Sequence, residues 1–114
     1  MKRDVHTYLD DIIESINLLV LYTKNKTQHD YENDDLLHDA ILRRLEIIGE
    51  AVRHIPNEFR TKYPDINWKE IAGMRDILIH EYFGVNAERV WKTIQEDIPK
   101  LQSQMKQVLA SLKE

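Results

Sequence analysis

The sequence predicts an all-α fold, an up-and-down bundle of four to five helices, and three observations carry this prediction. Apolar residues recur at steps of three and four, no stretch alternates as a strand does, and only three glycines and three prolines interrupt the chain. A chain of 114 residues is long enough for one core. We therefore expect a single helical domain over residues 1–114.

The first predicted helix covers residues 4–22 and begins at Asp4, where the helix dipole favours an acidic side chain. Residues 23–35 are polar and lack a clear period, which predicts a loop with a short helical turn opening at Thr27. This polar stretch separates the first helix from the second.

The second predicted helix covers residues 36–55 and ends before Pro56, because the residue preceding a proline disfavours the helical conformation. Gly49 lies in its middle, where glycine costs about 1 kcal/mol relative to alanine. That cost indicates that another backbone passes close to Gly49, although a tolerated glycine is the alternative.

The third and fourth predicted helices each begin at an asparagine. Asn67, with Glu70 three residues later, forms a variant of the capping box, and the helix that follows is expected to end near Gly84. Asn86 caps the fourth helix. Pro99 either kinks that helix or begins a fifth one.

Composition and charge narrow the class of protein. The chain is 42% hydrophobic and 32% charged, which is typical of a soluble helical protein. The lack of cysteine excludes disulfides and is compatible with a cytoplasmic location. We expect neither a membrane span nor a signal peptide. The net charge of -4 means that any contact with nucleic acid must be local or be built by more than one chain.

The stretch "GMRDILIHEYFGV", residues 73–85, carries Arg75, His80 and Tyr82 on an otherwise apolar helix. Histidine moves protons near neutral pH, and the donors of arginine stabilise charge on a phosphate. One of each beside a single phosphate would suffice to cleave RNA through its own 2'-hydroxyl without a metal. The alternative is structural: an arginine paired with an acid, a histidine at a helix C-terminus and a tyrosine that anchors a loop.

The spacing of this arginine and histidine constrains the geometry. On an ideal helix Arg75 and His80 are separated by ~140°, so a single straight helix does not direct both at one point. Either the helix unwinds before Gly84, or two copies of the chain face each other across a two-fold axis and pool their side chains.

The pattern Arg-x4-His-x-Tyr in this stretch resembles the HepT-like ribonuclease toxins of the HEPN superfamily. Nearly the whole chain takes part, because segments resembling the four helices of that family occur in order. These segments are "RDVHTYLDDIIESI", "AILRRLEIIGEAVRHIP", "PDINWKEIAGMRDILIHEYFGV" and "VWKTIQEDIPKL".

The resemblance implies roles for individual residues. Arg75 and His80 match the catalytic pair, and Asp76 matches a position that often holds a polar residue. Tyr82 matches the tyrosine that a cognate minimal nucleotidyltransferase antitoxin modifies with AMP, which would repel RNA. The resemblance further implies a homodimer with its cleft at the interface, an RNA substrate such as tRNA or mRNA, and no cofactor. The rival hypothesis is a non-catalytic helical binding partner of a nucleotidyltransferase.

Other polar residues are weaker candidates. Glu50, Arg53 and His54 could line a cleft, or they could belong, with Glu46, to a solvated face of helical ion pairs. The spacing of the remaining histidines does not indicate a metal site. Trp68 and Trp91 are expected in the core, with stacking on an unpaired base as the alternative.

Overall fold

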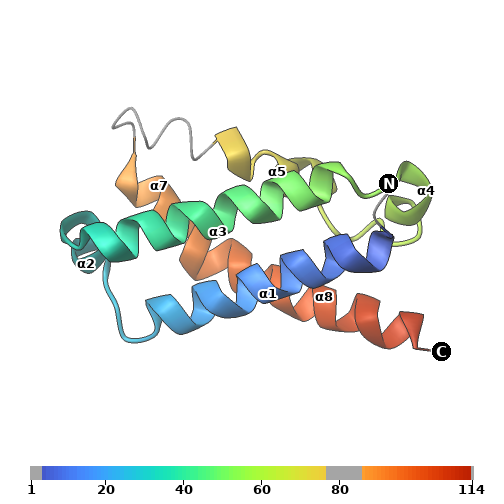
Figure 1. The fold of residues 1–114 in the computed structure, drawn as a ribbon, viewed down its shortest axis with the longest axis horizontal. Helices are drawn as coiled ribbons and strands as arrows, with labels where there is room; N and C mark the ends of the chain where they lie inside the picture. Colours follow the sequence, from blue (N-terminus) through green and yellow to red (C-terminus); the bar gives the residue numbers. More distant parts are fainter. Residues whose placement is uncertain (1–3, 77–85, 114) are drawn as a thin grey trace.

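Two long antiparallel helices, α1 (Val5–Thr23) and α3 (Asp35–Arg53), form the frame of the fold (Figure 1). They belong to a computed structural model that describes residues 4–76 and 86–113. α1 packs against α3 on one side and α8 (Ile98–Leu112) on the other. In the described ranges every regular element is helical, which confirms the all-α prediction.

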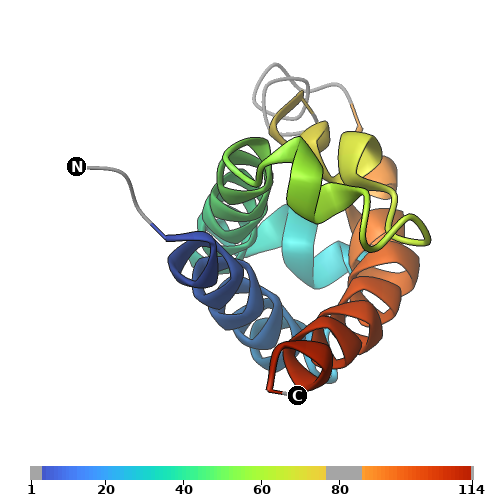
Figure 2. The same cartoon turned by 90° about the vertical axis from the view of Figure 1, so that its right-hand side faces the viewer.

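Short helices close the two ends of this frame. α2 (Gln28–Asn33) packs against α3 and α7 (Ala87–Lys92) and begins with a capping box in which Thr27 and Asp30 bond reciprocally. The predicted turn at Thr27 is thus confirmed as a short helix. At the opposite end, α4 (Asn57–Arg60) follows Pro56, where the second predicted helix ends. Figure 2 shows α1, α3 and α8 around the core, with α4 and α5 (Trp68–Ala72) closing one side.

The core is built from the apolar stripes of the long helices. Because each stripe repeats every three or four residues, it forms one helical face, which is buried against the neighbouring helices. Among the described residues, the apolar ones with at most 1% of their surface exposed are Leu9, Ile12, Ile16, Leu19, Tyr31, Ile41, Leu45, Ile48, Val52, Val90, Ile98, Met105 and Val108. Trp68 is buried as predicted, and Trp91 is half-buried against the core.

The third helix begins where the sequence predicts, but the prediction of one continuous helix is wrong. Asn67 caps α5, accepting a hydrogen bond from the Glu70 backbone N–H at 3.2 Å. The helix then ends at Ala72, and the chain turns at Gly73 before the backbone becomes helical again from Met74 to Asp76. Glycine favours such an ending because its free energy in a helix is less favourable than that of other residues except proline. Residues 77–85, with the expected end at Gly84, lie outside the described residues.

Pro99 belongs to a continuous helical run. α7 passes into a π-helical turn, η1 (Thr93–Asp97), and then into α8, which contains Pro99 in its first turn. A proline lacks an N–H, and its ring clashes with the carbonyl four residues before it. The wider π turn immediately before α8 relieves this clash. The predicted fourth helix is therefore α7 followed by this π turn, and α8 is the fifth helix, which follows without a break. Within the described parts of the chain, no helix has the length and apolar character needed to cross a membrane.

Candidate active site

The backbone of Arg75 is placed by a close approach to α3. A Cβ atom added at Gly49 would lie 3.1 Å from the Arg75 nitrogen and 3.3 Å from the Ala72 carbonyl oxygen. The prediction that another backbone passes close to Gly49 is confirmed. The missing side chain of this glycine lets the α5 junction rest directly on α3, which fixes where the arginine side chain begins.

The next residue of α3, Glu50, contacts the Arg75 side chain. Arg75 Nη1 donates to Glu50 Oε2 at 3.3 Å. Arg53 Nη1 lies 4.0 Å from the same oxygen, and His54 Nε2 lies 3.5 Å from Glu50 Oε1. These four side chains, which we call the Glu50 cluster, are each about half exposed. The cluster therefore brings cationic side chains from two segments to one accessible surface.

His54 joins the cluster to α1. Its ring stacks on Tyr8, with ring centroids 5.0 Å apart and planes inclined by 10°. A groove of about 370 Å³ runs beside this stack between α1 and α3. It is lined by Tyr8, Asp11, Arg43, Glu46, Ile47, Glu50, Ala51 and His54. The Glu50 cluster thus borders a hollow with charged groups of both signs.

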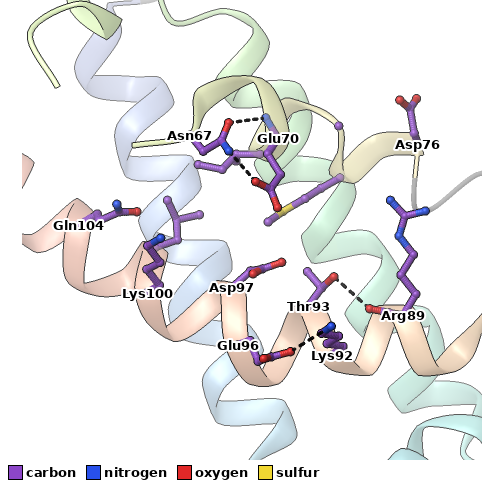
Figure 3. Close-up of a pocket in the computed structure, with 14 residues that line it drawn as sticks. Asn67, Glu70, Asp76, Arg89, Lys92, Thr93, Glu96, Asp97, Lys100 and Gln104 are labelled. Atoms are coloured by element: carbon purple, nitrogen blue, oxygen red, sulfur yellow. Dashed lines mark hydrogen bonds and ion pairs between the residues drawn. The ribbon is translucent and has the colours of Figure 1, made fainter. Parts of the chain in front are cut away.

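A second and larger groove of about 700 Å³ lies between α5 and the α7–η1–α8 run (Figure 3). Its charged lining residues are Glu70, Asp76, Arg89, Lys92, Glu96, Asp97 and Lys100, so neither sign dominates. Burial, reinforced by Glu70 and Glu96 nearby, raises the pKa of Asp97. In Figure 3, both Asp76 and Arg89 are seen at the same end of this groove.

Similarity to known proteins identifies the family of this chain. The sequence model of the family described as "Ribonuclease HepT-like" matches residues 12–108. The chain belongs to the HepT-like ribonuclease family. The matched region includes both segments of the Glu50 cluster, and it covers most of the chain.

Curated relatives of known name agree with this assignment. A Thermococcus cleftensis protein named "Probable ribonuclease HepT" is 45% identical over 108 residues, which are 95% of this chain and 98% of that protein. A Methanocaldococcus jannaschii protein named as a candidate RNase is 45% identical over 104 residues, covering 91% of this chain and 95% of its own length. No solved structure matches the chain.

One of these relatives is about twice as long as this chain. A second M. jannaschii protein, named as a gamma-glutamylcyclotransferase and candidate RNase, is 49% identical over 112 residues. The match covers 98% of this chain and spans half the length of that protein. A HepT-like region therefore occurs there within a longer polypeptide.

The structure unites some of the predicted site residues of this HepT-like protein and separates others. Arg75, Glu50 and Arg53 lie together in the Glu50 cluster, while Asp76 lines the second groove. His80 and Tyr82 lie outside the described residues.

Two residues of this neighbourhood, His54 and Tyr8, differ in how far the sequence predicted them. The helical spacing of Glu50 and His54 made their contact foreseeable, and His54 was weighed as a cleft residue. Tyr8 was not predicted, because its stacking joins helices whose relative placement the sequence does not specify.

Other polar side chains have structural partners of their own. Arg60 donates to the carbonyls of Val52 and Ile55 at 2.6 and 3.0 Å, so it caps the end of α3. Arg43 pairs with Glu46 at 3.2 Å. Among the described residues, no group of three His, Asp or Glu side chains has the arrangement of a metal site.

Proposed function

We propose that this protein is a metal-independent endoribonuclease and the toxin of a toxin–antitoxin pair. The observation that carries the proposal is the placement of Arg75, in a HepT-like chain, on an accessible surface with Arg53 and His54 beside it. On an acidic protein this cluster provides the local positive charge that an RNA phosphate requires.

The proposed reaction uses the ribose of the substrate as its own nucleophile. A base removes the proton of the 2'-hydroxyl, the 2'-oxygen attacks phosphorus, and the bond to the 5'-oxygen breaks while an acid protonates that oxygen. The products are a 2',3'-cyclic phosphate and a 5'-hydroxyl. His80 acts as the general acid or base, and Arg75 donates to the phosphate oxygens whose negative charge grows in the transition state.

A homodimer completes this site in the proposal. The ~140° separation of Arg75 and His80 on an ideal helix is resolved when Arg75 of one protomer works with His80 of the partner subunit. Two chains also double the number of cations near the cleft. The substrate is single-stranded RNA or an exposed segment of a tRNA or mRNA.

Tyr82 is the proposed control point. Addition of AMP to its hydroxyl by a cognate nucleotidyltransferase would place bulk and a negative phosphate two residues from His80. Like charge would then repel the RNA backbone, so the modified toxin would be inactive.

The test is a cleavage assay with the purified protein, single-stranded RNA and a chelator, followed by mass analysis of the product ends. We expect 2',3'-cyclic phosphate and 5'-hydroxyl ends, and loss of cleavage in the His80→Ala variant with unchanged far-ultraviolet circular dichroism. Cleavage by His80→Ala at the wild-type rate, or products with 3'-hydroxyl ends, would overturn the proposal.

A non-catalytic partner of a nucleotidyltransferase is the second candidate, and the net charge of -4 favours it, since that charge weakens general affinity for RNA. Expression of the protein alone distinguishes the two candidates. A toxin arrests growth, and the His80→Ala variant relieves the arrest, whereas a binding subunit leaves growth unchanged in both cases.

A further inference from the structure

We infer that Glu50 is a positioning residue, which orients the Arg75 guanidinium for the RNA phosphate. The inference rests on the proposed function and extends it to a residue outside the Arg-x4-His-x-Tyr pattern. Its basis is the pair of neighbouring α3 residues that contact Arg75. Gly49 lies against the backbone of Arg75, and Glu50 binds its side chain at 3.3 Å.

The placement of Arg75 needs such a second contact. Its backbone is fixed at Gly49, but a long arginine side chain has several rotatable bonds and loses considerable rotamer entropy when it is held. Among the residues that the structure describes, Glu50 is the ion-pair partner of Arg75. The carboxylate therefore selects, from the many rotamers of Arg75, those that bring the guanidinium to Glu50 on α3.

The geometry of the contact leaves Arg75 able to bind an anion. A guanidinium has five N–H donors in a planar fork, and the Glu50 contact engages the Nη1 nitrogen alone. The Arg75 side chain is 46% exposed, so solvent, and hence a phosphate, has access to it. Glu50 thus binds one nitrogen of the guanidinium and leaves the other N–H donors of Arg75 for a phosphate.

The net charge of the Glu50 cluster indicates that Glu50 orients Arg75 without neutralising the cluster. The Glu50 carboxylate is shared among Arg75, Arg53 and His54, so the cluster carries at least one net positive charge. A single carboxylate that satisfied Arg75 alone would cancel its attraction for RNA. Sharing keeps that attraction while each contact restricts the motion of Glu50 itself.

The experiment compares Glu50→Gln with Glu46→Gln as the matched control. Glu46 lies one turn earlier on α3 and lines the same groove, but its partner is Arg43. Both variants lose one negative charge from the same surface. Cleavage of a fluorogenic single-stranded RNA is measured for each variant and resolved into kcat and KM.

We expect kcat of Glu50→Gln to fall about tenfold or more while KM stays equal or decreases, because transition-state contacts are lost and an acid near RNA is removed. Glu46→Gln should keep the wild-type kcat. Equal kcat values for the two variants would overturn the inference. A rise in kcat for Glu50→Gln would also overturn the inference, since the Glu50 carboxylate would then inhibit cleavage by occupying Arg75.

A second measurement does not depend on catalysis. Nuclear magnetic resonance relaxation gives the order parameter of the Arg75 Nε–H bond, which reports motion on the picosecond to nanosecond timescale. We expect this order parameter to decrease in Glu50→Gln and to stay unchanged in Glu46→Gln. No change in Glu50→Gln would contradict positioning, whereas a decrease in a protein that does not cleave RNA would refute the proposed function alone.

Discussion

The side chains of the candidate site are positioned by a few close contacts between charged groups. Contacts between Glu50 and its neighbours Arg53 and His54 follow from helical spacing, so the sequence allowed their prediction. The contact with Arg75 spans 25 residues and depends on how α5 rests on α3. The sequence contained one sign of it, the costly glycine at position 49, but it did not identify which backbone would approach.

Asp97 offers a prediction about pH at this scale. Burial, Glu70 and Glu96 raise its pKa in the folded protein. A raised pKa means that the folded state holds the proton more tightly than the unfolded chain does. The stabilising contribution of protonated Asp97 is therefore complete below the ordinary aspartate pKa and is lost as the pH rises through the raised value.

We accordingly expect Asp97→Asn to raise the thermal midpoint at pH 7 and to leave it nearly unchanged near pH 3, below the ordinary aspartate pKa. The gain should stay below about 1 kcal/mol, because the groove is open to solvent and screening weakens the repulsion. Thermal unfolding followed by circular dichroism at both pH values measures this. An equal shift at the two values would show that charge is not the cause.

At the scale of elements, periodicity and capping residues predicted most of the helices correctly. α1, α3 and the caps at Thr27, Asn67 and Asn86 occur where the sequence placed them. The break at Gly73 and the π turn before Pro99 were not predicted as such, because a lone glycine is often tolerated within a helix and a proline has several ways of being accommodated. Both features were decided by tertiary packing and local backbone sterics.

Gly49→Ala tests how the helices position the site. Alanine would gain about 1 kcal/mol of helix propensity, but its Cβ would push against the backbone of Arg75 and Ala72. We expect a small net change in stability together with at least about a tenfold loss of RNA cleavage, since small displacements of catalytic groups are costly. Paired measurements of the thermal midpoint and kcat check this. Wild-type cleavage by this variant would show that the approach at Gly49 does not position Arg75.

For the whole molecule, the main question is how an acidic chain presents a site for a polyanion. The Glu50 cluster supplies local positive charge, and a two-fold arrangement would bring two such clusters together. The family and the all-α architecture could be predicted from the sequence because motifs and apolar stripes extend over nearly the whole chain. The geometry of the proposed dimer could not be predicted, since helical periodicity identifies apolar faces without specifying whether a second copy covers them.

The most direct test mixes two inactive proteins. Arg75→Ala and His80→Ala chains are unfolded, combined in equal amounts, refolded together and assayed for RNA cleavage. If Arg75 works with His80 of the partner subunit, half of the dimers are mixed and each has one intact site. The expected activity is then about a quarter of wild type. A contaminating ribonuclease would act in each protein before mixing, so it cannot imitate this result. Absence of cleavage after mixing, in dimers that form normally, would contradict a site shared between two chains.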